Sequence, residues 1–434
     1  MNTTISKKSS SVTQKDPDVL QLIQPDKVHS SIFTDEGIFD LEMNKLFRRT
    51  WLFALHESEI PNPGDFKAFD LAKTPVIAVR NKDQSISMLV NRCRHRGATL
   101  CERGVGNARN LTCWYHGWVY DLDGSLISDV GQGKKEELGL TRLPRVDNYR
   151  GFVFTSFAPE GETLDEYLNE ARAFMDILLD YSPTGRIRIN PKVVHKYKFQ
   201  GNWKQLGMDG YHVHFVHASV VDIFSRRKNT AGSAVGALQI EDPWSDESSS
   251  RARGFPFGHA ALDLRQQRLD NADSLVEAVK KGPGGKAYAD KMTEIHGAER
   301  AREIIALHGD PHLGVFPNLQ LIHDHLRVMV PISASETEIH MYPIFLEDVT
   351  PEFNTARLRN HEDFYGPASF GSPDDAEIFE RVQEGLHAGV NPWMAVGRGL
   401  DRDWVETGDV QVGPISDEVT QRAQFAEWRR LMTD

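Results

Sequence analysis

Two short segments of this sequence each carry one cysteine and one histidine at a spacing suited to metal binding. Cys93 and His95 form the first pair, and Cys113 and His116 form the second, so the pattern is C-x-H-x17-C-x2-H. Two thiolates and two imidazoles can hold a structural zinc ion, or a two-iron, two-sulfur cluster with the cysteines on one iron and the histidines on the other. The sequence therefore predicts a metal centre built from these four residues.

The order of the ligands favours the cluster. A zinc finger of the nucleic-acid type pairs Cys with Cys and then His with His, whereas each of these segments supplies one of each. Gly97 and Gly117 follow the two histidines and allow backbone amides to approach the cluster sulfurs. Cys101 lies between the segments and matches no ligand position, so we expect a small buried free thiol.

A second group of candidate ligands follows at Asp209, His212 and His217. The two histidines are five residues apart, unlike the i, i+4 pair of zinc metalloproteases. Two imidazoles and one carboxylate on one face of a metal form the facial triad of non-haem Fe(II) oxygenases. Histidines also cluster as ordinary core or surface groups, so the company of the first motif is what favours an iron site. His214 is left outside the ligand set.

Both groups resemble one known family. The segment from Cys93 to Gly124, with CRHRG and CWYHGWVYDLDG, resembles the Rieske domain of the aromatic ring-hydroxylating oxygenases. The D-x2-H-x4-H pattern that begins at Asp209 resembles the catalytic-domain motif of the same family. The resemblance implies that the first four ligands hold one [2Fe–2S] cluster per chain and that His212 and His217 bind one mononuclear Fe(II).

The family's third iron ligand is an aspartate far downstream, and residues 366–377, GPASFGSPDDAE, look like that region. The matching position is the second of the adjacent pair, Asp375. An acidic run is also typical of a helix N-terminus. We therefore expect Asp374 to cap a helix that begins near Ala376, with Asp375 in its first turn.

The resemblance gives Asp209 a role in electron transfer. In the family's trimers this aspartate bridges a Rieske histidine of one subunit to an iron histidine of the next, which implies a path from His116 through Asp209 of the partner subunit to His212. A carboxylate that accepts hydrogen bonds from two ligand imidazoles fixes both rings. The stretch between Lys204 and Asp209 is shorter here than in many relatives.

The implied function is that of a terminal oxygenase component. Such a large subunit uses dioxygen, and electrons from NAD(P)H delivered by a reductase or ferredoxin, to hydroxylate an aromatic ring; dihydroxylation and monohydroxylation both occur in the family. Residues 409–432 resemble the subgroup that acts on benzoate, salicylate, anthranilate, terephthalate or cumate, which implies an α3β3 hexamer with a small β subunit. A homotrimeric monooxygenase or demethylase stays open, as does a structural zinc protein.

Substrates of that subgroup carry a carboxylate, which an arginine binds with two prongs. Arg327 interrupts the apolar run 326–330 and is the candidate substrate-binding residue. Alternation along a half-exposed strand could instead place Arg327 on a solvated face. Arg398 and Arg402 are weaker candidates.

Composition agrees with a large metalloenzyme. A chain of 434 residues is long enough for two or three domains. The net charge of −12 disfavours nucleic acid and acidic membranes as partners. Three cysteines leave no disulfide framework, which favours the cytoplasm. The N-terminus lacks the apolar core of an export signal, and no apolar run of transmembrane length is present.

The elements that must position these residues predict an α+β fold. We expect a mobile tail at 1–33, a helix at 34–51 packing on the catalytic domain, an all-β Rieske domain at 52–160, and a catalytic domain at 161–434 with an antiparallel sheet surrounded by helices. The predicted elements include strands at 75–79, 151–155, 192–199, 325–332 and 338–345 and helices at 163–179 and 374–387. Residues 271–303 predict a solvated helical insertion or a flexible lid.

Overall fold

The computed structural model describes residues 19–128, 137–209, 248–308 and 312–433. Residues 1–18 of the predicted mobile tail lie outside the described ranges. Residues 19–33, the rest of that predicted tail, are described and have regular structure. Strands β1 (Ile23–Gln24) and β2 (Lys27–His29) form an antiparallel sheet with β21 (Trp393–Ala395). The prediction for 19–33 was wrong because Val28 and Ile32 are buried in the core.

The predicted N-terminal helix is present but shorter. Helix α1 (Ser31–Thr34) precedes α2 (Glu36–Leu41), which continues as a π-helical turn over Glu42–Leu46. The side chain of Asp35 accepts hydrogen bonds from the amides of residues 37 and 38 and so caps the N-terminus of α2.

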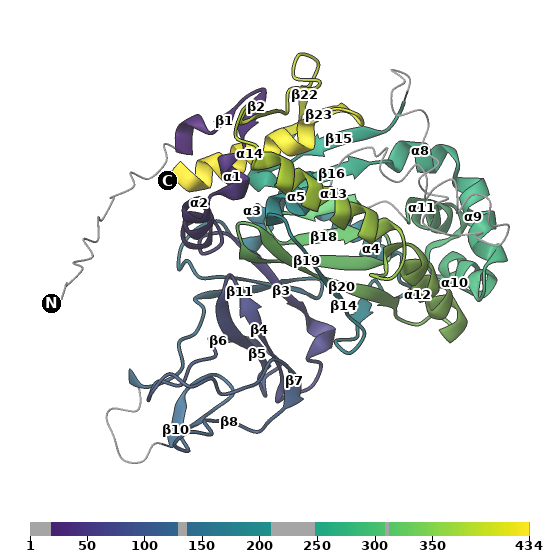
Figure 1. Ribbon diagram of the computed structural model, residues 1–434. Helices are drawn as coiled ribbons and strands as arrows, with labels where there is room; N and C mark the ends of the chain where they lie inside the picture. The colour runs from purple at the N-terminus through teal and green to yellow at the C-terminus, as the bar shows by residue number, and fades with distance from the viewer. Residues whose placement is uncertain (1–18, 129–136, 210–247, 309–311, 434) are drawn as a thin grey trace.

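The small region, residues 52–156, consists of three antiparallel sheets at one end of the molecule (Figure 1). Its strands are β3 (Leu52–His56), β4 (Asp65–Leu71), β5 (Thr74–Arg80), β6 (Ile86–Val90), β7 (Gly104–Asn107), β8 (Leu111–Thr112), β9 (Val119–Tyr120), β10 (Leu126–Ser128), β11 (Arg145–Tyr149) and β12 (Phe152–Ser156). The sheet orders are β6-β5-β4-β7, β10-β9-β8 and β11-β12-β3. Strands β5 and β12 confirm the predicted ones.

The large region is built on a ten-stranded antiparallel sheet, ordered β13-β20-β19-β18-β17-β16-β15-β23-β22 with β14 also paired to β20. The strands are β13 (Ile187–Ile189), β14 (His195–Phe199), β15 (Arg251–Gly254), β16 (Ala260–Asp263), β17 (His312–Val315), β18 (Leu319–Ile322), β19 (His325–Ser333), β20 (Glu336–Leu346), β22 (Trp404–Glu406) and β23 (Val410–Pro414). Strands β14, β19 and β20 match the predictions.

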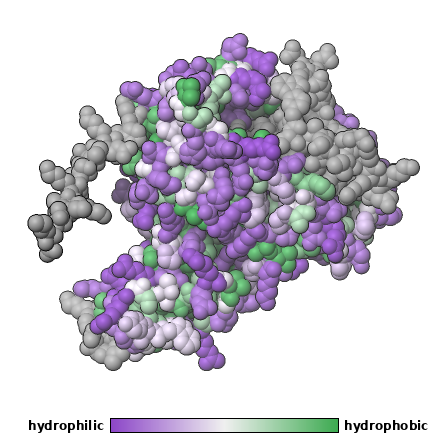
Figure 2. Space-filling view, viewed as in Figure 1, coloured by the Kyte–Doolittle hydropathy of each residue, from purple (hydrophilic) through white to green (hydrophobic). Residues whose placement is uncertain are grey.

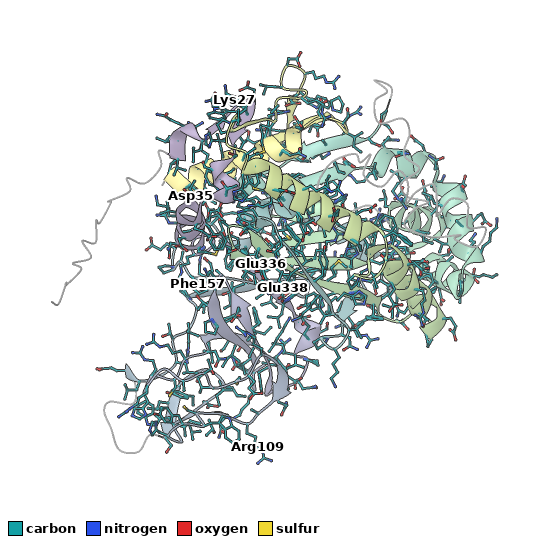
Figure 3. All side chains as sticks on the ribbon, in the orientation of Figure 1. Lys27, Asp35, Arg109, Phe157, Glu336 and Glu338 are labelled. Atoms are coloured by element: carbon teal, nitrogen blue, oxygen red, sulfur yellow. The ribbon has the colours of Figure 1, made fainter. Side chains whose placement is uncertain are left out.

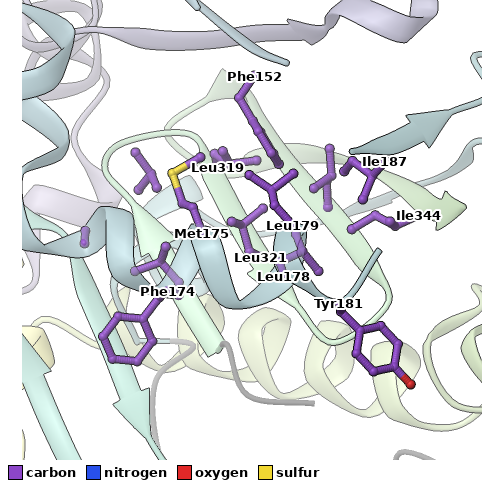
Figure 4. Packing of buried hydrophobic residues seen from close by; sticks show 14 of the residues in the cluster. Phe152, Phe174, Met175, Leu178, Leu179, Tyr181, Ile187, Leu319, Leu321 and Ile344 are labelled. Atoms are coloured by element: carbon purple, nitrogen blue, oxygen red, sulfur yellow. The ribbon is translucent and has the colours of Figure 1, made fainter. Parts of the chain in front are cut away.

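One face of this sheet packs on α4 (Arg172–Asp180), which follows α3 (Leu164–Leu168). Thr163 caps α3 in a reciprocal capping box with Glu166. Apolar residues of α4 meet those of β18 and β20, with Phe152 of β12 beside them (Figure 4). The predicted helix at 163–179 is thus two helices joined by a 3-10 turn.

The segment predicted as an insertion or lid is helical and packed. Helix α8 (Arg265–Asp270) is followed by α9 (Ala272–Lys281), α10 (Gly285–His296) and α11 (Ala298–Leu307). Tyr288, Met292 and Ile304 belong to the same buried cluster as α4. The helical prediction is confirmed, and the lid alternative does not fit because these helices contribute to the core.

The opposite face of the sheet is covered by α5 (Trp203–Asp209), α12 (Pro351–Tyr365) and α13 (Gly371–Leu386) (Figure 1). Residues 320 and 322 of β18 and 327 and 329 of β19 point to this side, since strand side chains alternate. Helix α14 (Val419–Thr433) packs against α5 and β15. Both faces of the sheet are therefore buried at its inner strands, such as β16 and β18.

Polar residues predominate on the face of the molecule in Figure 2, with apolar residues interspersed, as is usual for a water-exposed protein surface. Within the described residues, none of the helices combines the length and apolar character that crossing a bilayer requires.

Candidate functional site

The two loops with the predicted cluster ligands share one backbone design. In the first, the Cys93 amide donates to the Ala98 carbonyl at 2.8 Å and the Gly97 amide donates to the Cys93 carbonyl at 3.0 Å. In the second loop, the Cys113 amide donates a hydrogen bond to the Trp118 carbonyl at 2.8 Å. The Gly117 amide donates to the Cys113 carbonyl at 3.0 Å. The two glycines have φ of +78° and +72°, a conformation that favours glycine.

The four predicted ligands meet at the tips of these loops. Both cysteines are buried, at 2% exposure each, and the imidazole rings of His95 and His116 lie 4.5 Å apart. The ring of His95 stacks on Trp118 at 4.9 Å, and its buried Nδ1 has no hydrogen-bond partner among the residues that the structure describes. A buried imidazole nitrogen without a partner suits a metal ligand.

The side chain of Tyr120 lies behind the first loop. Its hydroxyl is 3.3 Å from the Cys93 Sγ and accepts a hydrogen bond from the Arg94 amide at 3.1 Å. Burial raises the pKa of Tyr120, and the neighbouring Cys93 raises it further. The phenol therefore stays protonated and can donate to the Cys93 sulfur.

The order of these residues, with one cysteine and one histidine in each loop, suits a two-iron cluster. Among the described residues, no three His, Cys, Asp or Glu side chains are placed to hold a single metal ion. Tetrahedral zinc needs its ligands around one point, whereas a Rieske cluster divides them between two irons. Cys101 is only partly buried, and burial raises the pKa of its thiol to about 11.

The tip around these loops is exposed, basic and aromatic. Trp114 and Tyr115, in the second loop, are 92% and 61% exposed. Arg109 projects from the same end of the small region (Figure 3). The exposed arginines of the segment 92–109 are Arg92, Arg94, Arg96, Arg103 and Arg109, of which Arg103 pairs with Asp70.

The predicted third iron ligand lies in the large region, on helix α13. Asp375 is buried at 8% exposure. The helix begins at Gly371, and its N-cap residue is Phe370. The expectation that Asp374 caps a helix beginning near Ala376 was therefore wrong, because Ser372 and Pro373 already lie in the first turn, where proline is tolerated.

Arg327 extends from strand β19 toward Asp375. The residue is 3% exposed. The guanidinium Nη1 lies 3.7 Å from the Asp375 Oδ2, and the guanidinium carbon lies 5.2 Å from the centre of the Tyr365 ring. The solvated-face alternative is thus wrong, because α12 and α13 cover this side of the sheet. A buried arginine is costly unless it is paired, so this position is built to hold a charge pair.

Two histidines that sequence reasoning missed surround this arginine. His325 Nε2 accepts a hydrogen bond from the Arg327 Nε at 3.0 Å, and the His361 ring lies 4.7 Å from that of His325. Burial lowers the pKa of His325 far below its ordinary value and that of His361 to about 3. His325 precedes Arg327 by two residues, and this same-face spacing was the signal that could have found it.

A second buried ion pair adjoins these histidines. The Arg357 Nη2 lies 2.7 Å from the Asp324 Oδ1, and His308 Nε2 lies 3.1 Å from the same oxygen. The positive charge of Arg357 and contacts with His308 hold the pKa of Asp324 low against burial. Arg357 thus has its own carboxylate, whereas Arg327 has Asp375.

The remaining predicted site residues lie in the segment that begins at Asp209 and in the C-terminal segment. His212, His214 and His217 lie outside the described residues. Asp209 is the last described residue of α5, and its side chain lies outside the described set as well. Arg402 pairs with Asp417 and Arg398 pairs with Glu418, so both weaker candidates belong to ion pairs of the C-terminal segment.

Comparison with known proteins agrees with this geometry. Residues 50–144 match the Rieske [2Fe-2S] domain family, and residues 188–433 match the catalytic domain of ring-hydroxylating alpha subunits. The chain belongs to the ring-hydroxylating oxygenase alpha subunits. It is therefore a Rieske non-haem iron oxygenase, and the match decides between the two metal hypotheses in favour of the [2Fe–2S] cluster.

Individual relatives of this alpha subunit cover most of its length. It is 33% identical to the 2-halobenzoate 1,2-dioxygenase large subunit of Burkholderia cepacia over 87% of this chain and 81% of the relative. It is 31% identical to the anthranilate 1,2-dioxygenase large subunit of Acinetobacter baylyi over 94% of this chain and 90% of that relative. A solved structure of naphthalene 1,2-dioxygenase has the same fold, with a TM-score of 0.78 and 24% sequence identity. The match covers 96% of this chain and 94% of that chain.

Proposed function

We propose that this alpha subunit hydroxylates the ring of an aromatic carboxylic acid, with dioxygen as co-substrate. The mononuclear Fe(II) is held by His212, His217 and Asp375. The observation that carries the proposal is the buried guanidinium of Arg327 beside the Asp375 carboxylate.

Charge balance connects this pair to the substrate class. In the ion pair, Asp375 neutralises Arg327. When Asp375 serves a metal cation, Arg327 needs another anion, because a buried unpaired charge is strongly unfavourable. A substrate carboxylate supplies it, and a guanidinium binds a carboxylate with two parallel hydrogen bonds.

The residues around Arg327 favour an acid over a hydrocarbon. His325 orients the guanidinium through its hydrogen bond, and His361 adds two buried ring nitrogens without partners within the described residues. Such polar groups need hydrogen-bonding atoms nearby. Relatives named for 2-halobenzoate, anthranilate and toluate are 31–33% identical, and those named for biphenyl or benzene are 28–29% identical.

The chain's own residues divide the work between two metal centres. When bound, the cluster carries single electrons and the iron with its open positions activates dioxygen. Cys93, Cys113, His95 and His116 hold the cluster near the surface, while Arg327 orients the acid. Asp209 of the partner subunit accepts a hydrogen bond from the exposed His116 and so links the two centres across a trimer interface.

The exposed tip supports this assembly. A basic and aromatic surface at Trp114 and the arginines around it suits an acidic partner, and this chain itself carries a net charge of −12. We propose an α3β3 hexamer with a small β subunit, located in the cytoplasm and reduced by a ferredoxin or reductase. Measuring the mass of the assembly with and without a co-expressed β subunit distinguishes α3β3 from a homotrimer.

The function is tested with the reconstituted assembly, a reductase system and NADH. Benzoate, anthranilate and 2-halobenzoate are compared with benzene and naphthalene by product analysis and oxygen uptake. We expect turnover of the acids only, with a diol or a phenol as product. Turnover of the neutral rings at equal rates would falsify the assignment to aromatic acids, and demethylation alone would favour the monooxygenase alternative.

A further inference from the structure

The two loops that carry the cluster ligands share a backbone design but differ at the residue that closes each loop. This closing residue, five positions after the cysteine, is Ala98 in the first loop and Trp118 in the second. In both loops its carbonyl accepts the hydrogen bond from the cysteine amide at 2.8 Å. A methyl group thus occupies one closing position and an indole the other, so the two halves of the site are not equivalent.

The indole of Trp118 contacts the histidine of the opposite loop. Its ring is nearly parallel to that of His95, with an interplanar angle of 10° and a distance of 4.9 Å between ring centres. Trp118 is 3% exposed and belongs to the buried core of the small region, together with Cys93 and Cys113. The side chain therefore connects His95 to this core, while the backbone of Trp118 closes the loop of His116.

The imidazole of His116 has a more open environment. His116 is exposed, and the Tyr115 ring, 3.9 Å away, belongs to a residue that is itself 61% exposed. The planes of the two imidazoles are nearly perpendicular, at an angle of 76°. Water can therefore reach His116, whereas the indole of Trp118 covers one face of His95.

The stacking contact fixes the plane of the His95 ring. Aromatic rings attract one another in offset-stacked arrangements, and a metal-binding histidine needs a fixed ring orientation. The Nδ1 of His95 is buried and has no hydrogen-bond partner within the described residues. This nitrogen is therefore available as the ligand atom, while the indole holds the ring from its face.

We propose that Trp118 is a positioning residue for the [2Fe–2S] cluster, which makes the two histidine ligands inequivalent and lowers the reduction potential. The indole fixes the plane of His95 and excludes water from one face of this ligand. Reduction adds one negative charge to the centre, and surroundings that exclude water solvate that charge less well. This inference rests on the proposed cluster ligands, and it depends neither on the mononuclear iron nor on the substrate.

The test is Trp118→Leu in the full-length protein carrying its cluster. Leucine keeps an apolar side chain in the core but removes the ring that stacks on His95. Redox titration gives the reduction potential, and pulsed electron paramagnetic resonance of the dithionite-reduced protein gives the couplings of the two histidine nitrogens. We expect the potential to rise, and one of the two nitrogen couplings to change while the other keeps its wild-type value.

A residue that only fills the core would move neither of these signals. In that case Trp118→Leu would lower the stability of the protein and leave the potential and both nitrogen couplings as in wild type. That result in the folded variant would overturn the proposal.

The matched control is Trp114→Leu. Trp114 lies in the same loop, next to Cys113, but it is 92% exposed. We expect this variant to retain the wild-type potential and nitrogen couplings. An equal shift in both variants would show a general effect of removing an indole near the cluster and would overturn the positioning role.

Trp118→Phe covers the case in which Trp118→Leu does not fold. A phenyl ring can still stack on His95 but covers less of the imidazole, so we expect a smaller rise in potential. A wild-type potential in Trp118→Phe, when the leucine variant is unfolded, overturns the inference. Wild-type protein that itself lacks a Rieske signal would instead contradict the proposed cluster ligands.

Discussion

The two regions of this protein that carry the predicted metal ligands are built in different ways. In the small region, each loop supplies a cysteine, a histidine and a left-handed glycine within a few residues, and closes its own hydrogen bonds, as in the 2.8 Å bond from Cys93 to Ala98. In the large region, strand β19 supplies Arg327, which meets Asp375 of α13, and His325, whose ring lies near that of His361 of α12. The first site is encoded locally, and the second exists only when the sheet and its covering helices pack.

This difference predicts that the two centres respond independently to mutation. A change in the large region should leave the cluster spectrum intact, and a change in the cluster loops should leave the iron affinity intact.

The largest effect is expected for Asp375→Ala. Removing a ligand should weaken mononuclear iron binding by more than about 100-fold, beyond the effect of an orienting neighbour, and abolish hydroxylation. Metal analysis should fall from three irons per chain toward two, as a two-iron cluster requires. The control is Asp374→Ala, which removes the adjacent carboxylate and should retain iron. Loss of the cluster in Asp375→Ala would contradict the independence of the two sites.

Arg327→Gln should separate substrate recognition from metal binding. Loss of a charged hydrogen bond costs about 1.5–3 kcal/mol, which corresponds to about 10- to 150-fold weaker binding of an aromatic acid. Substrate titration of the anaerobic, iron-loaded protein measures this change. Arg398→Gln, at an arginine paired with Glu418, serves as the control. Equal weakening of neutral aromatic ligands would assign Arg327 a structural role.

Asp209→Asn tests the proposed connection between the regions. The amide keeps the shape of the side chain but lacks the charge, so both metals should stay bound while oxidation of the reduced cluster slows about 10- to 100-fold. Rapid mixing of the reduced protein with oxygen and substrate, followed by absorbance of the cluster, gives the rate. An unchanged rate with full metal content excludes the bridge.

The smallest effect is expected within the small region, for Tyr120→Phe. This change removes the hydroxyl that lies 3.3 Å from the Cys93 sulfur. A hydrogen bond to a ligand sulfur stabilises the reduced cluster, so its loss should lower the reduction potential without loss of iron. A redox titration measures the shift, with Tyr115→Phe as the control. A potential equal to that of wild type would show that the hydroxyl does not donate to the sulfur.

The elements that sequence analysis predicted well are those with strong local patterns. Strands β5, β12, β19 and β20 form at the predicted short apolar segments, and β5 and β12 are buried almost throughout. The errors concern packing. Residues 19–33 and 271–303 are polar enough to suggest a tail and a lid, yet each buries a few apolar side chains against distant parts of the chain.

The sequence by itself determined the cluster region, because the ligands, their glycines and their order all lie within two short loops. It also determined that residues 325, 327 and 329 share one face of a strand, since strand side chains alternate. Only the tertiary structure decided that α12 and α13 cover that face, which buries Arg327 beside Asp375. Burial of a long-range charge pair depends on how the layers stack, and no local pattern specifies that.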